Sequence, residues 1–229
     1  MLRWSMLATC PYVCCALLAL SVFSVGYVQT APLNLLDPAD TLLDTTRWQA
    51  ATDRYVVIYT ASEADRRYLL DIFEIIADAR DDLQTWQLEL PASHLIIHPD
   101  LASYQTATGQ AWYVAAIADR AELRIDMQRA RVLSERGSLQ LTLRHELFHV
   151  AQPEGLARYL AEGLAMHFSG EQPQARVWQG PLAQLERILA APRSQQELNQ
   201  AMARAYAEVA NDLQRVPITC LLFADDTCP

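Results

Sequence analysis

The segment from residue 139 to residue 165 constrains the fold of this chain more than any other part. It contains His145-Glu146-Leu147-Phe148-His149, in which two histidines lie four residues apart. On a helix these positions share one face, so the two imidazoles can bind one metal ion, with Glu146 beside a metal-bound water. Apolar flanks at 139–143 and 150–151 favour a buried helix over an amphipathic helix with half-exposed histidines.

A second helix is expected soon after the first. Pro153 and Gly155 are stop signals, and the run Tyr159-Leu160-Ala161-Glu162-Gly163-Leu164-Ala165 follows them. Glu162 is the expected third ligand, with only twelve residues between it and His149. Glu154 is an alternative carboxylate, but it would have to fold back beside Pro153.

Other histidine patterns fit the sequence less well. In an H-E-x-x-H-x-x-G-x-x-H site the glycine and the last histidine would be Gln152 and Gly155. His167 lies five residues beyond Glu162, about 140° around a helix, and is expected to face elsewhere.

The runs 143–150 and 157–165 resemble the peptidase MA-like metallopeptidases of the gluzincin group, whose pattern is H-E-x-x-H followed by aromatic-Leu-x-Glu-Gly-x-Ala. The resemblance implies a zincin-like α+β fold, with a small mixed β-sheet and an active-site helix followed by a mainly helical C-terminal part. It implies three Zn²⁺ ligands and one general base: His145, His149 and Glu162 for the metal, and Glu146 for the base. The last residues of the chain match nothing in that pattern.

The expected activity is that of a zinc metallopeptidase, a hydrolase in which Glu146 activates a zinc-bound water to cleave a peptide or protein substrate. By analogy with the family, the strand predicted at 122–127 would offer an edge to an extended peptide. Tyr206 is a candidate for stabilising the oxyanion, and Tyr159 for orienting Glu162, although either tyrosine fits simple packing. Two alternatives stay open: a membrane-tethered binding or assembly factor without turnover, and a cell-wall peptide amidase.

Charge and composition narrow the list of partners. The net charge is −9, and all 18 basic residues are arginines, scattered singly or in pairs. Without a basic stripe, a nucleic-acid partner is not expected. The absence of lysine also excludes a Walker A loop and a Schiff-base lysine.

The N-terminal segment is uncharged from Trp4 to Leu36, with Arg3 before it. We expect residues 1–30 to be a signal peptide or membrane anchor, which places the catalytic part in the periplasm, outside the cell, or on the outer side of the cytoplasmic membrane. Residues 31–52 are the expected linker, 53–215 the metallopeptidase domain and 216–229 a tail. Cys220 and Cys228 in that tail form a disulfide or remain two free thiols, and export favours the disulfide.

Runs rich in β-branched and aromatic residues predict strands over 54–60, 94–98, 112–117 and 122–127. Periodicity and caps predict helices over 62–87, 101–106, 182–190 and 194–213. Ser62 is the expected cap of the first helix, and its expected buried stripe is Leu69, Leu70, Phe73, Ile76 and Leu83. Ser194 with Glu197 is a predicted capping box. His94 and His98 share one face of a strand, as partly exposed sheet residues rather than a second ligand pair.

Overall fold

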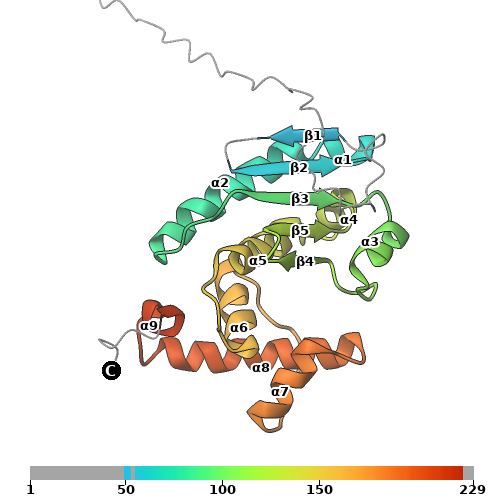
Figure 1. The fold of residues 1–229 in the computed structure, drawn as a ribbon. Helices are drawn as coiled ribbons and strands as arrows, with labels where there is room; N and C mark the ends of the chain where they lie inside the picture. Colours follow the sequence, from blue (N-terminus) through green and yellow to red (C-terminus); the bar gives the residue numbers. More distant parts are fainter. Residues whose placement is uncertain (1–48, 53–54, 224–229) are drawn as a thin grey trace, which may run out of the picture.

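The computed structural model describes residues 49–52 and 55–223, which fold into a mixed α+β structure with more helix than strand (Figure 1). The expected signal or anchor segment, most of the expected linker and Cys228 lie outside the described residues. Within the described ranges, no helix is long and apolar enough to cross a membrane.

A five-stranded sheet forms the upper half of Figure 1, with the order β1-β2-β3-β5-β4. Its strands are β1 (Gln49–Thr52), β2 (Val56–Thr60), β3 (Ser93–Ile97), β4 (Ala116–Asp119) and β5 (Arg124–Met127). The three inner strands are parallel, and β1 and β4 run antiparallel to them at the edges. The first of these edge strands lies in the range that was expected to be a linker.

The expectation that the strand at 122–127 is an edge is wrong. Its counterpart β5 pairs with β3 on one side and β4 on the other. The turn at 120–123 folds the chain back so that β4 becomes the outer strand, while Ile125 and Met127 of β5 are buried. Among the described strands, β4 is therefore the free edge on this side of the sheet, opposite the edge strand β1.

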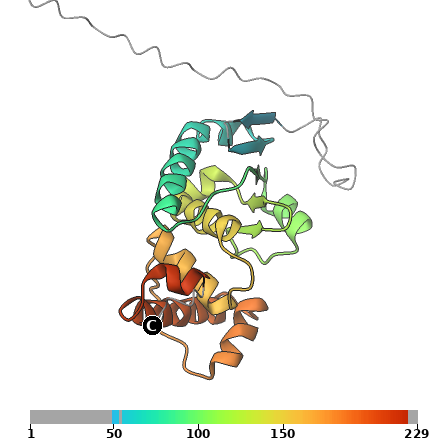
Figure 2. The ribbon, with the colours of Figure 1, turned by 60° about the vertical axis from the view of Figure 1, so that its left-hand side comes forward.

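Helices pack against the sheet, and the later helices of the chain extend below it in Figure 1. They are α1 (Glu63–Arg66), α2 (Leu69–Thr85), α3 (Leu101–Thr108), α4 (Ala130–Glu135), α5 (Leu139–Ala151), α6 (Arg158–Ser169), α7 (Leu182–Ala190), α8 (Gln195–Leu213) and α9 (Ile218–Phe223). Figure 2 shows α2 and α5 against one face of the sheet, with α6 to α9 gathered in the lower half. Within the expected tail, α9 packs Leu222 into the core.

The single helix expected from Ser62 to Gln87 is divided into α1 and α2 by a turn at Arg67 and Tyr68. Ser62 occupies the N-cap position, but its hydroxyl accepts from Arg129 Nη2 at 3.1 Å and not from a helix N–H. In the predicted stripe, Ile76 and Leu83 are buried, whereas Leu70 is 76% exposed. Leu70 lies six residues before Ile76 on the same helix, about 120° around its axis, and therefore faces away from the buried stripe.

The loop before β4 also departs from expectation, because the strand begins at Ala116 and not at Trp112. The Gln128 side-chain amide donates to the carbonyl oxygens of Trp112 and Val114, at 3.0 and 2.7 Å. These two side-chain bonds hold residues 112–115 in an irregular loop, which therefore does not form a strand.

One large hydrophobic core joins the sheet to α2, α5 and α6, and includes Val209 of α8. A smaller cluster lies between α7 and α8, around Leu185 and Ala201. Ser194 caps α8 as predicted, with its hydroxyl accepting from Glu197 N at 3.1 Å. The helix α6 lies at the boundary between the two clusters, because Leu164 belongs to the large core and Tyr159 packs against the smaller one.

Candidate metal centre

Helix α5 buries His145 and Glu146 of the H-E-x-x-H run and leaves His149 partly buried. Leu143 and Leu147 are fully buried on this helix, and His145 and Glu146 are each 8% exposed. One helical turn separates the two imidazoles, and their Nε2 atoms lie 3.1 Å apart. The prediction of a buried α5 is confirmed.

The end of α5 supplies an unexpected partner for His149. Gln152 leaves the helix for an extended conformation (ψ 153°), as is typical of a residue before proline. Its Oε1 lies 3.2 Å from His149 Nδ1. An amide oxygen only accepts, so Nδ1 is the donor in this contact, and a neutral ring in this tautomer would offer its Nε2 lone pair to a metal ion.

The start of α6 is capped from another helix. Its N-cap residue, Ala157, has no side-chain acceptor for the first helical N–H groups. Glu186 of α7 accepts from the backbone N–H of Arg158 at 3.1 Å and of Tyr159 at 2.9 Å. This contact fixes the helix one turn before Glu162.

Close approach of α6 to α8 explains the glycine that follows Glu162. A Cβ on Gly163 would lie 2.5 Å from Val209 Cγ2 and 2.6 Å from the carbonyl oxygen of Ala205. Real Cβ atoms do not approach backbone this closely. A glycine here lets α6 pack against α8 and sets the depth at which Glu162 enters the site.

Glu162 completes a triangle with the two imidazoles. Its Oε2 lies 3.3 Å from His145 Nε2 and 3.4 Å from His149 Nε2. In a tetrahedral site with bonds of about 2.0–2.1 Å, two ligand atoms lie about 3.3 Å apart, so the three side chains fit a metal ion of that size. Over residues 49–52 and 55–223, they are the one group of three or more His, Cys, Asp and Glu residues that can hold a metal ion.

The charges of this triangle are strongly coupled in the metal-free chain. Burial lowers the pKa of His145, but the carboxylates of Glu162 and the nearby Glu171 outweigh that effect and raise the pKa to about 10. Burial raises the pKa of Glu162, and the two imidazoles overcome that effect and hold it well below its usual range. A metal ion at the centre would replace the proton of His145 as counter-charge to the carboxylate.

Glu146 lies beside the triangle and beneath the edge strand. Burial raises the pKa of its carboxyl, opposed by the positive charge of His145 and His149. The backbone of Ala118 in β4, against which α5 packs, also lowers this pKa slightly. The predicted base is therefore held between α5 and the free edge of the sheet.

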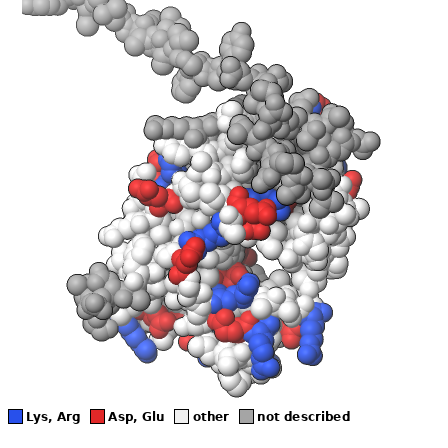
Figure 3. Space-filling model, viewed as in Figure 1, with Lys and Arg blue, Asp and Glu red and all other residues white. Residues whose placement is uncertain are grey.

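Ion pairs surround the mouth of the site. Arg158, half exposed, places Nη1 3.9 Å from Glu162 Oε1, and Arg120 lies 3.9 Å from Glu154. Figure 3 shows acidic and basic side chains beside one another on this face. The carboxylate of Glu154 is 90% exposed and does not belong to the triangle, as the preference for Glu162 predicted.

The two candidate tyrosines make other contacts. Tyr206 stacks on His167, with ring centroids 4.0 Å apart, and its carbonyl lies 3.2 Å from His167 Nε2. Tyr159 packs against the cluster between α7 and α8. Their suggested roles at the site stay predictions.

The remaining candidates lie away from the triangle. His98 pairs with Asp126, Nε2 to Oδ1 at 2.8 Å, and the ring of His94 lies near that of Tyr59. Cys220 is disulfide-bonded, while Cys228 falls outside the described residues.

A surface cavity of about 540 Å³ lies between α2, α5 and the C-terminal end of α6. Its lining includes Asp78, Asp81 and Asp82 but none of the three candidate ligands. The cavity is therefore separate from the candidate metal centre.

Sequence reasoning missed Gln152 and Glu186. The first had a local signal, because a residue before proline leaves a helix and can turn its side chain back. Glu186 had none, since it reaches α6 from a helix much later in the chain. Comparisons with protein-family models, curated proteins and solved structures found no significant match to this chain.

Proposed function

We propose that this protein is a zinc-dependent metallopeptidase with a zincin-like fold. The observation that carries the proposal is the triangle of His145, His149 and Glu162, with Glu146 buried beside it. Two imidazoles and one carboxylate are a ligand set that suits Zn²⁺ and leaves a fourth position open, as catalytic zinc sites require.

Zinc bound at this centre would lower the pKa of its water to about 7 and polarise the carbonyl of the substrate. Glu146 accepts the proton of the attacking water and passes it to the leaving amine. Its raised pKa suits both transfers.

The free edge of β4 is the proposed binding surface for the substrate. An extended peptide can pair with an unpaired strand through main-chain hydrogen bonds. Because α5, which carries Glu146, packs against β4, a peptide on this edge would run past the general base. The role that the sequence assigned to the strand at 122–127 therefore passes to β4.

The location of the enzyme is part of the proposal. The uncharged segment from Trp4 to Leu36 supports export, with the catalytic part in the periplasm, outside the cell, or anchored to the outer side of the cytoplasmic membrane. The disulfide at Cys220 agrees with an oxidising compartment.

One observation favours a second candidate, a zincin-like binding or assembly factor without turnover. The ring of Tyr206 is stacked on His167, so the residue expected to stabilise the oxyanion is engaged elsewhere. Such a factor would keep the metal for structure alone.

The test uses the full-length chain, the Glu146→Gln variant and the control Glu135→Gln, an exposed carboxylate on α4. Zinc is measured by elemental analysis, and cleavage of a peptide mixture is followed by mass spectrometry. We expect one zinc per chain in all three, and a rate lower by about 10²–10⁴-fold in Glu146→Gln alone. If the zinc-loaded wild-type protein cleaves no peptide, the proposal that it is a peptidase is wrong. Release of the peptide from a cell-wall glycan in place of cleavage within it identifies an amidase.

A further inference from the structure

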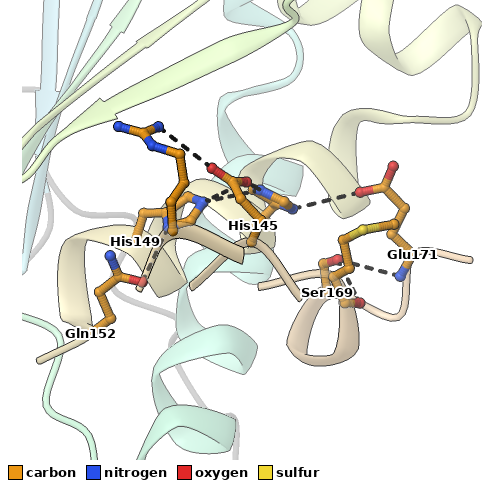
Figure 4. A network of polar contacts seen from close by, with 8 residues as sticks. His145, His149, Gln152, Ser169 and Glu171 are labelled. Atoms are coloured by element: carbon orange, nitrogen blue, oxygen red, sulfur yellow. Dashed lines mark hydrogen bonds and ion pairs between the residues drawn. The ribbon is translucent and has the colours of Figure 1, made fainter. Parts of the chain in front are cut away.

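The two imidazoles of the candidate metal centre differ in how their outer nitrogens are supported. Gln152 Oε1 lies 3.2 Å from His149 Nδ1. His145 Nδ1 is buried and has no partner within hydrogen-bond distance. The nearby acceptor is Glu171, whose Oε2 lies 3.6 Å away (Figure 4).

The backbone delivers Glu171 to this position through the end of α6. Gly170 adopts a left-handed conformation (φ 80°) that ends the helix. The N–H of Glu171 then donates to the carbonyl of Met166 at 3.0 Å, with Ser169 Oγ at 3.3 Å. These bonds fix the backbone of Glu171, and Figure 4 shows its side chain directed toward His145.

The chemistry of the pair suits an orienting contact. A histidine that ligates a metal through Nε2 carries its proton on Nδ1, and that N–H needs an acceptor when it is buried. A shift of a few tenths of an ångström would bring the 3.6 Å separation into the usual range of about 2.7–3.2 Å. The side chain of Glu171 is 43% exposed, so water still solvates its carboxylate.

We propose that Glu171 is a positioning residue for the metal centre: its carboxylate accepts the Nδ1–H of His145 and holds the Nε2 lone pair toward the metal. The inference rests on the proposed metal site and not on peptidase activity. It assigns a carboxylate acceptor to His145 and an amide acceptor to His149, so the two ligands are supported unequally. In the contrary case, Glu171 is only a surface charge without effect on metal binding.

The experiment measures zinc affinity of the full-length chain by competition with a chromophoric chelator. The variants are Glu171→Ala, Glu171→Gln and the matched control Glu135→Gln. The control removes an exposed carboxylate of α4, far along the chain from Glu171, that pairs with Arg131 of the same helix. Loss of an outer partner weakens metal binding by about 10–100-fold, which we expect for Glu171→Ala. Glu171→Gln keeps an acceptor oxygen and should lose less zinc affinity than Glu171→Ala. The zinc affinity of the control should stay within about twofold of that of wild type.

A second measurement separates positioning from general destabilisation. Thermal unfolding in the presence of a chelator should give the same midpoint for Glu171→Gln and Glu171→Ala, because both variants remove the charge beside His145. In the zinc-loaded protein, nitrogen-15 NMR should show the Nδ1–H of His145 protected from exchange in wild type, and exchanging faster in Glu171→Ala. Unchanged affinity and unchanged exchange in Glu171→Ala overturn the inference.

Failure of this inference is distinguishable from failure of the proposed function. A wild type that binds zinc but cleaves no peptide removes the peptidase proposal and leaves the role of Glu171 standing. A wild type that does not bind zinc overturns both.

Discussion

Helices α5 and α6 contribute to the same centre in different ways. On α5, one helical turn brings two imidazoles together, and the spacing of His145 and His149 alone accounts for their proximity. On α6, the position of Glu162 depends on the cap from Glu186 and on the close approach to α8 that Gly163 permits. The histidine pair is therefore a local feature, while the triangle is a product of tertiary packing.

The surroundings of the two helices differ as well. Leu143 and Leu147 bury α5 within the large core, against the sheet and α2. Helix α6 touches both the large core and the smaller cluster of α7 and α8. Changes in the lower half of the molecule should consequently disturb Glu162 while leaving the histidine pair in place.

The largest expected effect comes from removing a ligand. Glu162→Ala should weaken zinc binding by more than the about 10–100-fold typical of an outer partner, because the metal loses its only carboxylate. Glu154→Ala is the matched control, since the sequence offered it as the alternative ligand and its side chain is 90% exposed. Chelator competition measures both variants. Equal losses of zinc affinity in the two variants would contradict the assignment of Glu162 as a metal ligand.

The next effect is a dependence of zinc affinity on pH. In the metal-free chain the pKa of His145 is raised from 6.5 to about 10, and zinc must displace that proton. Zinc affinity should rise by about tenfold for each pH unit from pH 6.5 to 8.5, measured by competition in matched buffers. A flat profile would contradict the coupling of His145 to its carboxylate neighbours.

The same pKa shifts set the stability of the metal-free fold. For His145, the raised pKa gives a contribution that is full below pH 6.5 and is lost as pH rises toward 10. For Glu162, the lowered pKa gives a contribution that is present above pH 4.5 and is lost in acid. Thermal unfolding with a chelator should therefore show a midpoint that falls between pH 6.5 and 10.

Gly163→Ala tests the packing of α6 against α8. Alanine normally favours a helix by about 0.5–1 kcal/mol over glycine, but overpacking here should cost about 1–3 kcal/mol. Adding Val209→Ala relieves the side-chain clash and leaves the Ala205 carbonyl in place, so the double variant should recover only part of the loss. Urea unfolding measures both. A more stable Gly163→Ala chain would show that α6 can move away without consequence.

The smallest effect is expected at the cap that joins α7 to α6. Glu186→Ala leaves the N–H groups of Arg158 and Tyr159 without their acceptor, which typically costs about 0.5–2 kcal/mol. Glu186→Gln keeps an acceptor oxygen and should lose less. Zinc affinity should fall slightly in Glu186→Ala, because α6 frays next to Glu162. An unchanged unfolding midpoint would show that water replaces the cap at no cost.

Much of the fold was predictable where local signals agreed. The bounds of α7 match the apolar run at 182–190, and Ser194 caps α8 as its spacing with Glu197 predicted. Helix α4 escaped prediction because its cap comes from far along the chain: buried Asp65 accepts from Arg131 N at 2.8 Å. Arg129 in the same region engages the hydroxyl of Ser62, so that hydroxyl does not cap α1.

Residue order alone accounts for the spacing of His145 and His149, the identity of the third candidate ligand and the place where α5 ends. Helical periodicity and proline geometry act over a few residues, so they can be read from the order of the chain. Long-range packing selected the strand that became the free edge, the depth of α6 against α8, and the side chains that support the imidazoles. These features depend on contacts between residues distant in sequence, such as Glu186 with Tyr159 and Glu171 with His145, and packing alone brings those residues together.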